Sequence, residues 1–295
     1  MNPFLDWCFK YLFGTEENKP NLIGFLNLML MPQSPIVDVE FMNNESLPSS
    51  PEIKECVFDI VCKDQNGERY LIEVQNGKMI EIKDRIIYYT CRLMDRMGKR
   101  GSGWNYSDIK RVYTICLMNF TFESNPKLRR DIQLYDIDDN TLFSDKINII
   151  MLQLPCLKAE SLGECKANYE LLLYLLKEMQ AGMKTIDELK QEIANTTLPQ
   201  ETKEVFYRVL DTADVGSLSE KDQMRYESAL KNYLDTMSCI EYATVKVREE
   251  GKAEGKAEGE FEAKVSIAKS MKEKGLDNKI IAECTGLSLE QIEAL

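Results

Sequence analysis

The chain has 295 residues, of which 44% are apolar and 29% charged, and this composition excludes an intrinsically disordered protein. Histidine is absent, which excludes serine–histidine and cysteine–histidine catalysis and metal sites built on imidazole ligands. The net charge of −12 argues against a protein that binds nucleic acid over its whole surface.

The N-terminal segment predicts two helices and a strand. Residues 4–31 place apolar side chains at helical spacing, and the turn-like polar segment 14–20 divides them into two helices. Residues 36–42 then have the alternating apolar pattern of a strand.

A β-hairpin is predicted next. Residues 55–62 and 68–75 are two apolar runs of strand length, and Asn66 and Gly67 between them favour a tight turn. The two strands are therefore expected to pair directly with each other.

A helix and further strands complete the first half. Residues 80–97 return to helical spacing, and residues 111–120 form a β-branched and aromatic run that is typical of a central strand. Residues 132–136 and 147–154 predict two more strands. This order of elements predicts an α/β fold in which a mixed sheet is flanked by helices.

Beyond Pro155 the strand patterns stop, and the second half is predicted to be all helical. The predicted helices span residues 164–183, 187–195, 200–213 and 221 onward. A repeat of Gly, Glu and Lys at residues 250–260 predicts an exposed, marginal helix, because each glycine costs ~1 kcal/mol relative to alanine. We interpret this repeat as a linker rather than a glycine-lined face for a second helix, because it has no large apolar residue to bury.

Residues 264–295 predict short helices with the two-helix, glycine-turn shape of a helix-turn-helix. The second helix offers Ser288, Glu290 and Gln291 but neither Lys nor Arg, which favours a capping or self-association module over a DNA-reading one. We therefore expect a homo-oligomer formed through the C-terminal helices. The predicted divisions, an α/β domain, a helical extension, a linker helix and a small helical module, are residues 1–158, 159–247, 248–263 and 264–295.

The cysteines indicate a reducing compartment. All nine are scattered along the chain without a CxxC pair, a pattern typical of free thiols rather than disulfides or a zinc site. The apolar stretches are too short to span a bilayer, and no secretory leader opens the sequence. We expect a cytoplasmic protein without a membrane segment.

Two acidic residues interrupt the apolar strands of the hairpin. Asp59 and Glu73 come within one or two rungs of each other if the chain turns at Gly67, and Gln75 points to the same face as Glu73. Like charges this close are destabilising unless a cation neutralises them. The pair is either an ordinary polar pair on a half-exposed sheet or a site for Mg²⁺ or Mn²⁺.

A basic segment follows this pair. Residues 78–130 contain twelve basic residues against five acidic ones, a local net charge of +7 in an acidic protein. Such a segment is either the footprint of a DNA-binding face or a solvated helix and loop. Three arginines on the predicted helix fall on one stripe and are the DNA-binding candidates: Arg85, Arg92 and Arg96.

The D-x13-E-x-Q pattern of Asp59, Glu73 and Gln75 follows a helix with Asp6 and precedes a basic helix. In these features the chain resembles the recombination-promoting nuclease and transposase family of the PD-(D/E)XK nuclease superfamily, from the first helix to about Phe122. The resemblance implies a restriction-endonuclease-like fold and a Mg²⁺-dependent endonuclease that hydrolyses DNA phosphodiesters and promotes recombination or acts in mobile elements. It also implies that Asp59 and Glu73 are the metal ligands and that all three residues are catalytic.

Gln75 stands where the superfamily has a lysine, and a neutral amide can orient a water molecule but cannot supply charge. Lys54 and Lys78 are near enough in sequence to be considered as substitutes. The weaker candidates are Asp6 and Lys10, one helical turn apart on the substrate side, and Glu40 as a third acid. The competing interpretation is a nuclease-fold scaffold that binds nucleic acid or protein without turnover.

Overall fold

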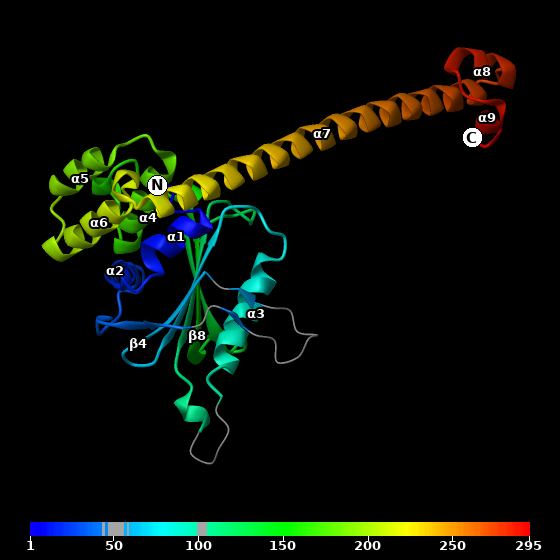
Figure 1. The fold of residues 1–295 in the computed structure, drawn as a ribbon. Helices are drawn as coiled ribbons and strands as arrows, with labels where there is room; N and C mark the ends of the chain where they lie inside the picture. Colours follow the sequence, from blue (N-terminus) through cyan, green and yellow to red (C-terminus); the bar gives the residue numbers. More distant parts are fainter. Residues whose placement is uncertain (43–44, 47–55, 58, 99–104) are drawn as a thin grey trace. The chain divides into compact units, whose positions relative to one another are not determined.

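The computed structural model describes residues 1–42, 45–46, 56–57, 59–98 and 105–295. Its centre is a mixed six-stranded sheet in the order β1-β4-β5-β6-β8-β7 (Figure 1). Strands β5, β6 and β8 are parallel, and the other neighbours are antiparallel. The strands of this sheet are β1 (Val39–Phe41), β4 (Ile60–Asp64), β5 (Arg69–Gln75), β6 (Val112–Met118), β7 (Arg129–Tyr135) and β8 (Leu142–Gln153).

Helices cover both faces of the sheet, with α3 on one side and α1 and α2 on the other (Figure 1). Because side chains alternate along a strand, Ile72 packs into a cluster with α1, α2 and α4, whereas Cys116 packs against Ile86 of α3. The Thr90 and Thr114 hydroxyls, 2.7 Å apart, also join α3 to β6. These helices are α1 (Asp6–Phe13), α2 (Lys19–Leu30), α3 (Ile82–Asp95) and α4 (Asn168–Ala181).

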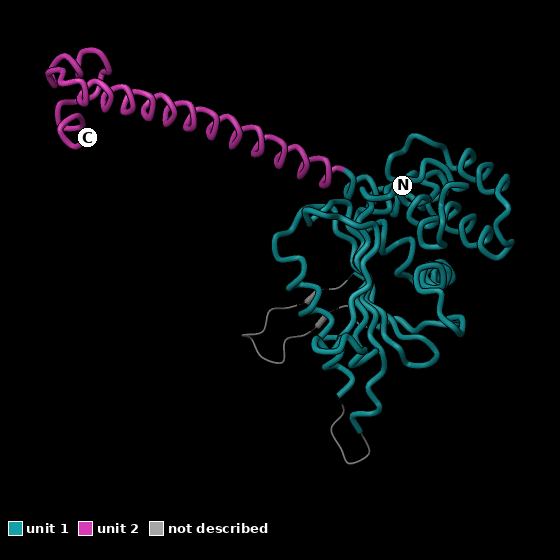
Figure 2. The backbone as a smooth tube through the Cα atoms, turned by 180° about the vertical axis from the view of Figure 1, so that it is seen from behind, with its two compact units in different colours: residues 1–230 teal, residues 231–295 magenta. Residues whose placement is uncertain are grey.

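The second half is helical, and the predicted fold class is confirmed. Its helices after α4 are α5 (Ile186–Ala194), α6 (Gln200–Thr212), α7 (Glu220–Glu273), α8 (Asn278–Thr285) and α9 (Leu289–Glu293). The chain divides into two compact units, Met1–Leu230 and Lys231–Leu295 (Figure 2). The four predicted divisions of the chain stay a prediction.

The C-terminal unit has a small apolar core of its own. Ala268 on α7 is buried with Ile281 of α8, Leu287, and Ile292 of α9. The glycine repeat lies within α7 and is exposed and helical as predicted, and a Cβ added at any of its three glycines would meet no described atom within 4 Å.

The hairpin has its predicted turn. β4 and β5 pair from Ile60↔Ile72 to Lys63↔Arg69, and Gly67 takes a φ of +78°, a conformation that glycine adopts without steric cost. The Asp64 carboxylate accepts the backbone N–H groups of residues 66 and 68, both at 2.9 Å, and closes the turn.

Two strand predictions are corrected by the structure. The strand expected at residues 36–42 is limited to β1, because the Asn27 side chain takes both backbone polar groups of Ile36 and removes them from the ladder. The strand expected at residues 55–62 is divided. Its first part is β3 (Cys56–Val57), which pairs with β2 (Glu45–Ser46) in a separate two-stranded sheet, and Glu55 and Phe58 lie outside the described residues.

Among the described residues, none of the helices combines the length and apolar composition that crossing a bilayer would require.

Candidate active site

The hairpin brings the two acids of the sequence pattern together. The β4–β5 register, in which Ile60 pairs with Ile72, puts Asp59 opposite Glu73. The Asp59 Oδ2 atom accepts the N–H of Val74 at 2.7 Å, so that a side chain replaces a strand carbonyl and the regular ladder ends here. Gln75 lies on the same face as Glu73, and its Nε2 atom donates to Glu73 Oε2 at 3.4 Å.

Burial makes ionisation of both carboxyls unfavourable. Glu73 is 3% exposed, and among the described residues its Oε1 atom has no hydrogen-bond partner. Burial, followed by the charge of Asp59, raises the pKa of Glu73, and Arg85 only partly opposes this. Burial also raises the pKa of Asp59, with a contribution from the nearby Asp6 carboxyl that the Val74 N–H counteracts. Without a bound cation, two ionised carboxylates at these buried positions would therefore destabilise the folded protein.

Helix α1 adds a cation and a third carboxylate. Lys10 Nζ lies 2.7 Å from Asp6 Oδ1, one helical turn before it, and 3.7 Å from Asp59 Oδ1. Burial opposes the lysine charge, but Asp6, Asp59 and Glu73 outweigh it and raise the pKa of Lys10. The ammonium group therefore stays charged beside the acid pair.

Helix α3 adds a second cation. Arg85 Nη2 lies 3.5 Å from Glu73 Oε2, while its guanidinium stacks on the Tyr89 ring at 4.9 Å and its other terminal nitrogen donates to the Met79 sulfur at 3.8 Å. The sequence assigned Arg85 to DNA alone. The sequence did not predict the contact of Arg85 with Glu73, because this contact requires α3 to pack on this face of the sheet.

Two asparagines position α1, and the sequence analysis missed both. The Asn76 side chain, directly after β5, donates to the Phe4 carbonyl at 2.6 Å and accepts from the Asn119 side chain at 3.0 Å. The Asn119 backbone N–H donates to the Gln75 carbonyl at 2.9 Å. The available signal was the polar Asn-Gly sequence that ends an apolar strand, where amides commonly bind neighbouring backbone groups.

The other candidates lie away from the acid pair or on its margin. Glu40 is an exposed residue of β1 that pairs across the ladder with Lys63 at 2.9 Å. Arg92 and Arg96 are half-buried residues on the same stripe of α3 as Arg85. Lys78 is exposed before α3, and Lys54 lies outside the described residues.

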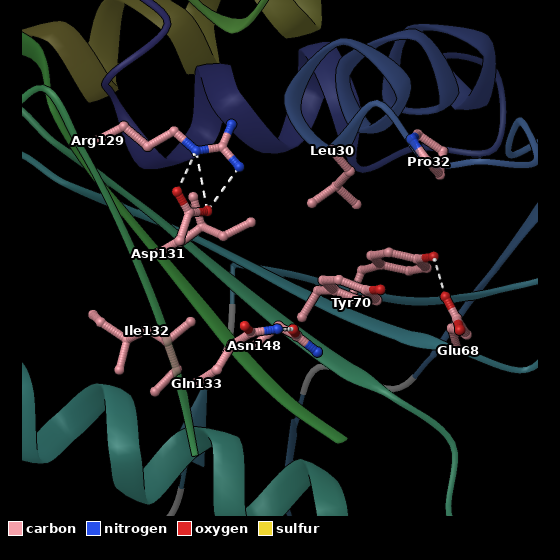
Figure 3. Close-up of a pocket in the computed structure, with 12 residues that line it drawn as sticks. Leu30, Pro32, Glu68, Tyr70, Arg129, Asp131, Ile132, Gln133 and Asn148 are labelled. Carbon is pink, nitrogen blue, oxygen red and sulfur yellow. Dashed lines mark hydrogen bonds and ion pairs between the residues drawn. The ribbon is translucent and has the colours of Figure 1, made fainter. Parts of the chain in front are cut away.

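A hollow of about 240 Å³ on the opposite face of the sheet offers less chemistry (Figure 3). Its Arg129 is held by Asp131 at 2.8 Å, and its Tyr70 hydroxyl donates to the Glu68 carboxylate at 3.4 Å. The polar groups at this hollow are thus satisfied by one another, in contrast to the unpaired oxygen of Glu73.

The acid pair fits a hard divalent cation. Carboxylate oxygens are the ligands that Mg²⁺ prefers, and this ion usually keeps several waters and takes only one or two carboxylates. The buried Oε1 atom of Glu73, which bonds to none of the described residues, and the facing Asp59 carboxylate supply such a ligand set. Within the described part of the chain, no group of three or more Asp, Glu or Cys side chains is arranged so that it could hold a metal ion by itself. Waters or substrate would therefore complete the coordination.

Comparison with known proteins agrees with the geometry. Residues 3–243 match the model of the PD-(D/E)XK nuclease family transposases, a range that covers the sheet and the helices that follow it as far as the first part of α7. A search of curated proteins and a search of solved structures each found no match. On the strength of the family match, the chain belongs to the PD-(D/E)XK nuclease family transposases.

Proposed function

We propose that the protein is a Mg²⁺- or Mn²⁺-dependent endodeoxyribonuclease that cuts DNA phosphodiesters, as a step in recombination or in the movement of a mobile element. The observation that carries the proposal is the buried Asp59–Glu73 pair, in which one Glu73 oxygen has no hydrogen-bond partner in the part of the chain that the structure describes. A divalent ion bound there would neutralise the carboxylates and stabilise negative charge on the phosphate.

The protein's residues have separate roles in this proposal. Asp59 and Glu73 hold the ion, and Gln75, whose amide lies 3.4 Å from Glu73, orients the attacking water. Water adds to phosphorus, one P–O bond to a sugar breaks, and the departing oxygen takes up a proton. The products are a phosphate monoester and a free hydroxyl.

The basic segment supports DNA as the substrate. Lys78 and Lys83 line a hollow of about 660 Å³ at the start of α3, next to the carboxyl ends of β5 and β6. Asp84 and Glu123 also line it, and Glu123 pairs with Lys83 at 3.2 Å. Further along α3, the stripe of Arg85, Arg92 and Arg96 continues the positive charge. Phosphate neutralisation by such residues supplies much of the affinity of proteins for DNA.

A nicking assay tests the activity. Supercoiled plasmid is incubated with protein and Mg²⁺, Mn²⁺ or EDTA, in parallel with Glu73→Ala and Asp59→Ala. We expect nicking by the wild type with either metal, none with EDTA, and none by the two variants. Equal nicking by all three proteins would identify a contaminant.

The alternative function is a nuclease-fold scaffold without turnover. Its specific support is that Lys10 and Arg85 already place positive charge beside Asp59 and Glu73, and that Gln75 is neutral. A wild type that binds DNA in Ca²⁺ but cuts none with Mg²⁺ or Mn²⁺ would favour it.

The cytoplasm remains the proposed location. The eight cysteines whose side chains the structure describes are all free thiols, a pattern that supports a reducing compartment. Fractionation of cells that express the tagged full chain tests this, and recovery in a secreted or membrane fraction would contradict it.

Helix α7 supports self-association of the chain. Its Leu230, Tyr233, Met237, Ile240 and Val247 follow a heptad pattern, and the last three are 42%, 50% and 67% exposed. We propose that they form a coiled coil with a second copy. Light scattering should find an oligomer that Ile240→Glu combined with Val247→Glu converts to a monomer, and a monomeric wild type contradicts this.

A further inference from the structure

The acid pair is contacted by positive charge from two helices that are far apart in the sequence. Lys10 comes from α1 and approaches Asp59 at 3.7 Å, whereas Arg85 comes from α3 and approaches Glu73 at 3.5 Å. Gln75, between them on β5, contributes only an amide. Among the described residues, the positive charges in ion-pair contact with the two acids thus come from these two helices.

Lys10 is the better placed of the two for this task. Arg85 is fixed on three sides by Glu73, the Met79 sulfur and the Tyr89 ring. The Lys10 contact with Asp59 is long, and a lysine is a compact charge on a flexible stem with three donor hydrogens. With three donor hydrogens, the ammonium group can keep its 2.7 Å contact with Asp6 and turn another hydrogen to a phosphate oxygen, giving up only the long contact with Asp59.

The position of Lys10 is also specified by the surrounding structure. The Lys10 ammonium group is held by Asp6 at 2.7 Å, and α1 buries Phe9 and Leu12 in the main core. The bond from Asn76 to the Phe4 carbonyl ties the start of the helix to the end of β5, the strand that carries Glu73. A surface lysine without such contacts would sample many rotamers, and its ammonium group would have no fixed position.

We propose that Lys10 is a catalytic residue of this site, whose ammonium contacts the scissile phosphate and supplies the positive charge that Gln75 cannot. The inference rests on the proposed nuclease function. In the reaction Lys10 transfers no proton. It donates hydrogen bonds to the phosphoryl oxygens, where negative charge grows as water attacks phosphorus and the P–O bond breaks, and such donors stabilise the transition state more than the ground state.

The test replaces Lys10 and then restores charge from the neighbouring strand. Lys10→Met keeps most of the length of the aliphatic stem, and Lys10→Met with Gln75→Lys brings an ammonium to the acid pair from β5. Lys19→Met is the matched control, since Lys19 is a helix lysine with its own acidic partners, Glu16 and Asp38. Each protein is examined for single-turnover cleavage in Mn²⁺, DNA affinity in Ca²⁺ and the Mn²⁺-induced rise in melting temperature.

We expect Lys10→Met to slow cleavage on the order of 100-fold, the usual effect of removing one transition-state donor. Its DNA affinity should equal that of the wild type, and Gln75→Lys should recover much of the lost rate. Its Mn²⁺-induced stabilisation should be at least as large as that of the wild type, because a cation beside Asp59 is removed. Lys19→Met should behave as wild type throughout. Glu73→Ala, in contrast, should lose both cleavage and the response to Mn²⁺.

Other outcomes overturn the inference in distinguishable ways. Cleavage by Lys10→Met at the wild-type rate overturns it while the nuclease function stands. A parallel loss of rate and of DNA affinity makes Lys10 a DNA-binding residue only. If Lys10→Met and Lys10→Arg are equally slow and Gln75→Lys restores no activity to Lys10→Met, Lys10 is a structural residue. A wild type that cleaves nothing overturns the inference together with the proposed function.

Discussion

Replacing Glu73 with glutamine should stabilise the metal-free protein, although the residue is buried in the sheet. Glutamine has nearly the same shape but no charge. Ionised Glu73 has a like charge opposite it and an oxygen without a hydrogen-bond partner among the described residues. Function and stability are therefore opposed at this position, as they commonly are in active sites.

The magnitude follows from the raised pKa. Burial and the Asp59 charge raise the pKa of Glu73 from 4.5 to about 8. At about 1.4 kcal/mol per pKa unit, ionising this group in the folded protein costs at most about 5 kcal/mol. Because the folded pKa is the higher one, the contribution of Glu73 to stability is fully present below pH 4.5 and is lost as the pH rises through about 8. Glutamine has no such dependence.

The assay is urea unfolding of both proteins in EDTA between pH 5 and pH 8. Near pH 5 the two should be similar, and at pH 8 the variant should be the more stable by on the order of 2–4 kcal/mol, below the upper bound. Adding Mn²⁺ at 100 times its dissociation constant should return about 2.7 kcal/mol to the wild type and nothing to the variant.

A second buried carboxylate in the same hairpin is the control. Asp64 is 7% exposed but accepts two backbone N–H groups and the Tyr70 hydroxyl. Asp64→Asn should therefore destabilise the protein, because it disrupts bonds that hold the turn. If Glu73→Gln destabilises the protein to a similar extent at pH 8, Glu73 is a structural residue and the reasoning is refuted.

Three further predictions follow from other parts of the chain. Charge reversal on the α3 stripe should weaken DNA binding in Ca²⁺ for all sequences. It should also reduce the slope of log affinity against log salt concentration by about one per lost phosphate contact. An unchanged slope in a folded variant would show that α3 is not part of the DNA interface. The variant carries glutamate at Arg85, Arg92 and Arg96. Gly24→Ala should lower stability by about 1–3 kcal/mol in urea, because its Cβ would lie 2.5 Å from a Val205 methyl; wild-type stability would show that α6 yields easily. Alanine at the three glycines of the α7 repeat should instead add ~1 kcal/mol each to helix stability, measured by circular dichroism, and a loss of helicity would indicate a close partner there.

The local features of the hairpin were predictable from the sequence. Asn66 and Gly67 specify a tight turn, and the two-residue period of strands then requires Glu73 and Gln75 to share a face. With the turn in place, Asp59 has few positions other than opposite Glu73. Short-range backbone geometry is sufficient for these conclusions about the hairpin. The fold class, in turn, was predictable from the order of the helical and strand patterns along the chain.

What surrounds the acid pair was decided by tertiary structure. The division of the strand at residues 55–62 depends on the Asp59 side chain capturing the Val74 N–H across the hairpin. The approach of Lys10 depends on a hydrogen bond between Asn76 and Phe4, 72 residues apart, and on the apolar core that holds α1. Periodicity describes which face of an element is apolar, but not which other element covers it. The charges beside Asp59 and Glu73 are therefore a property of how α1 and α3 pack on the sheet.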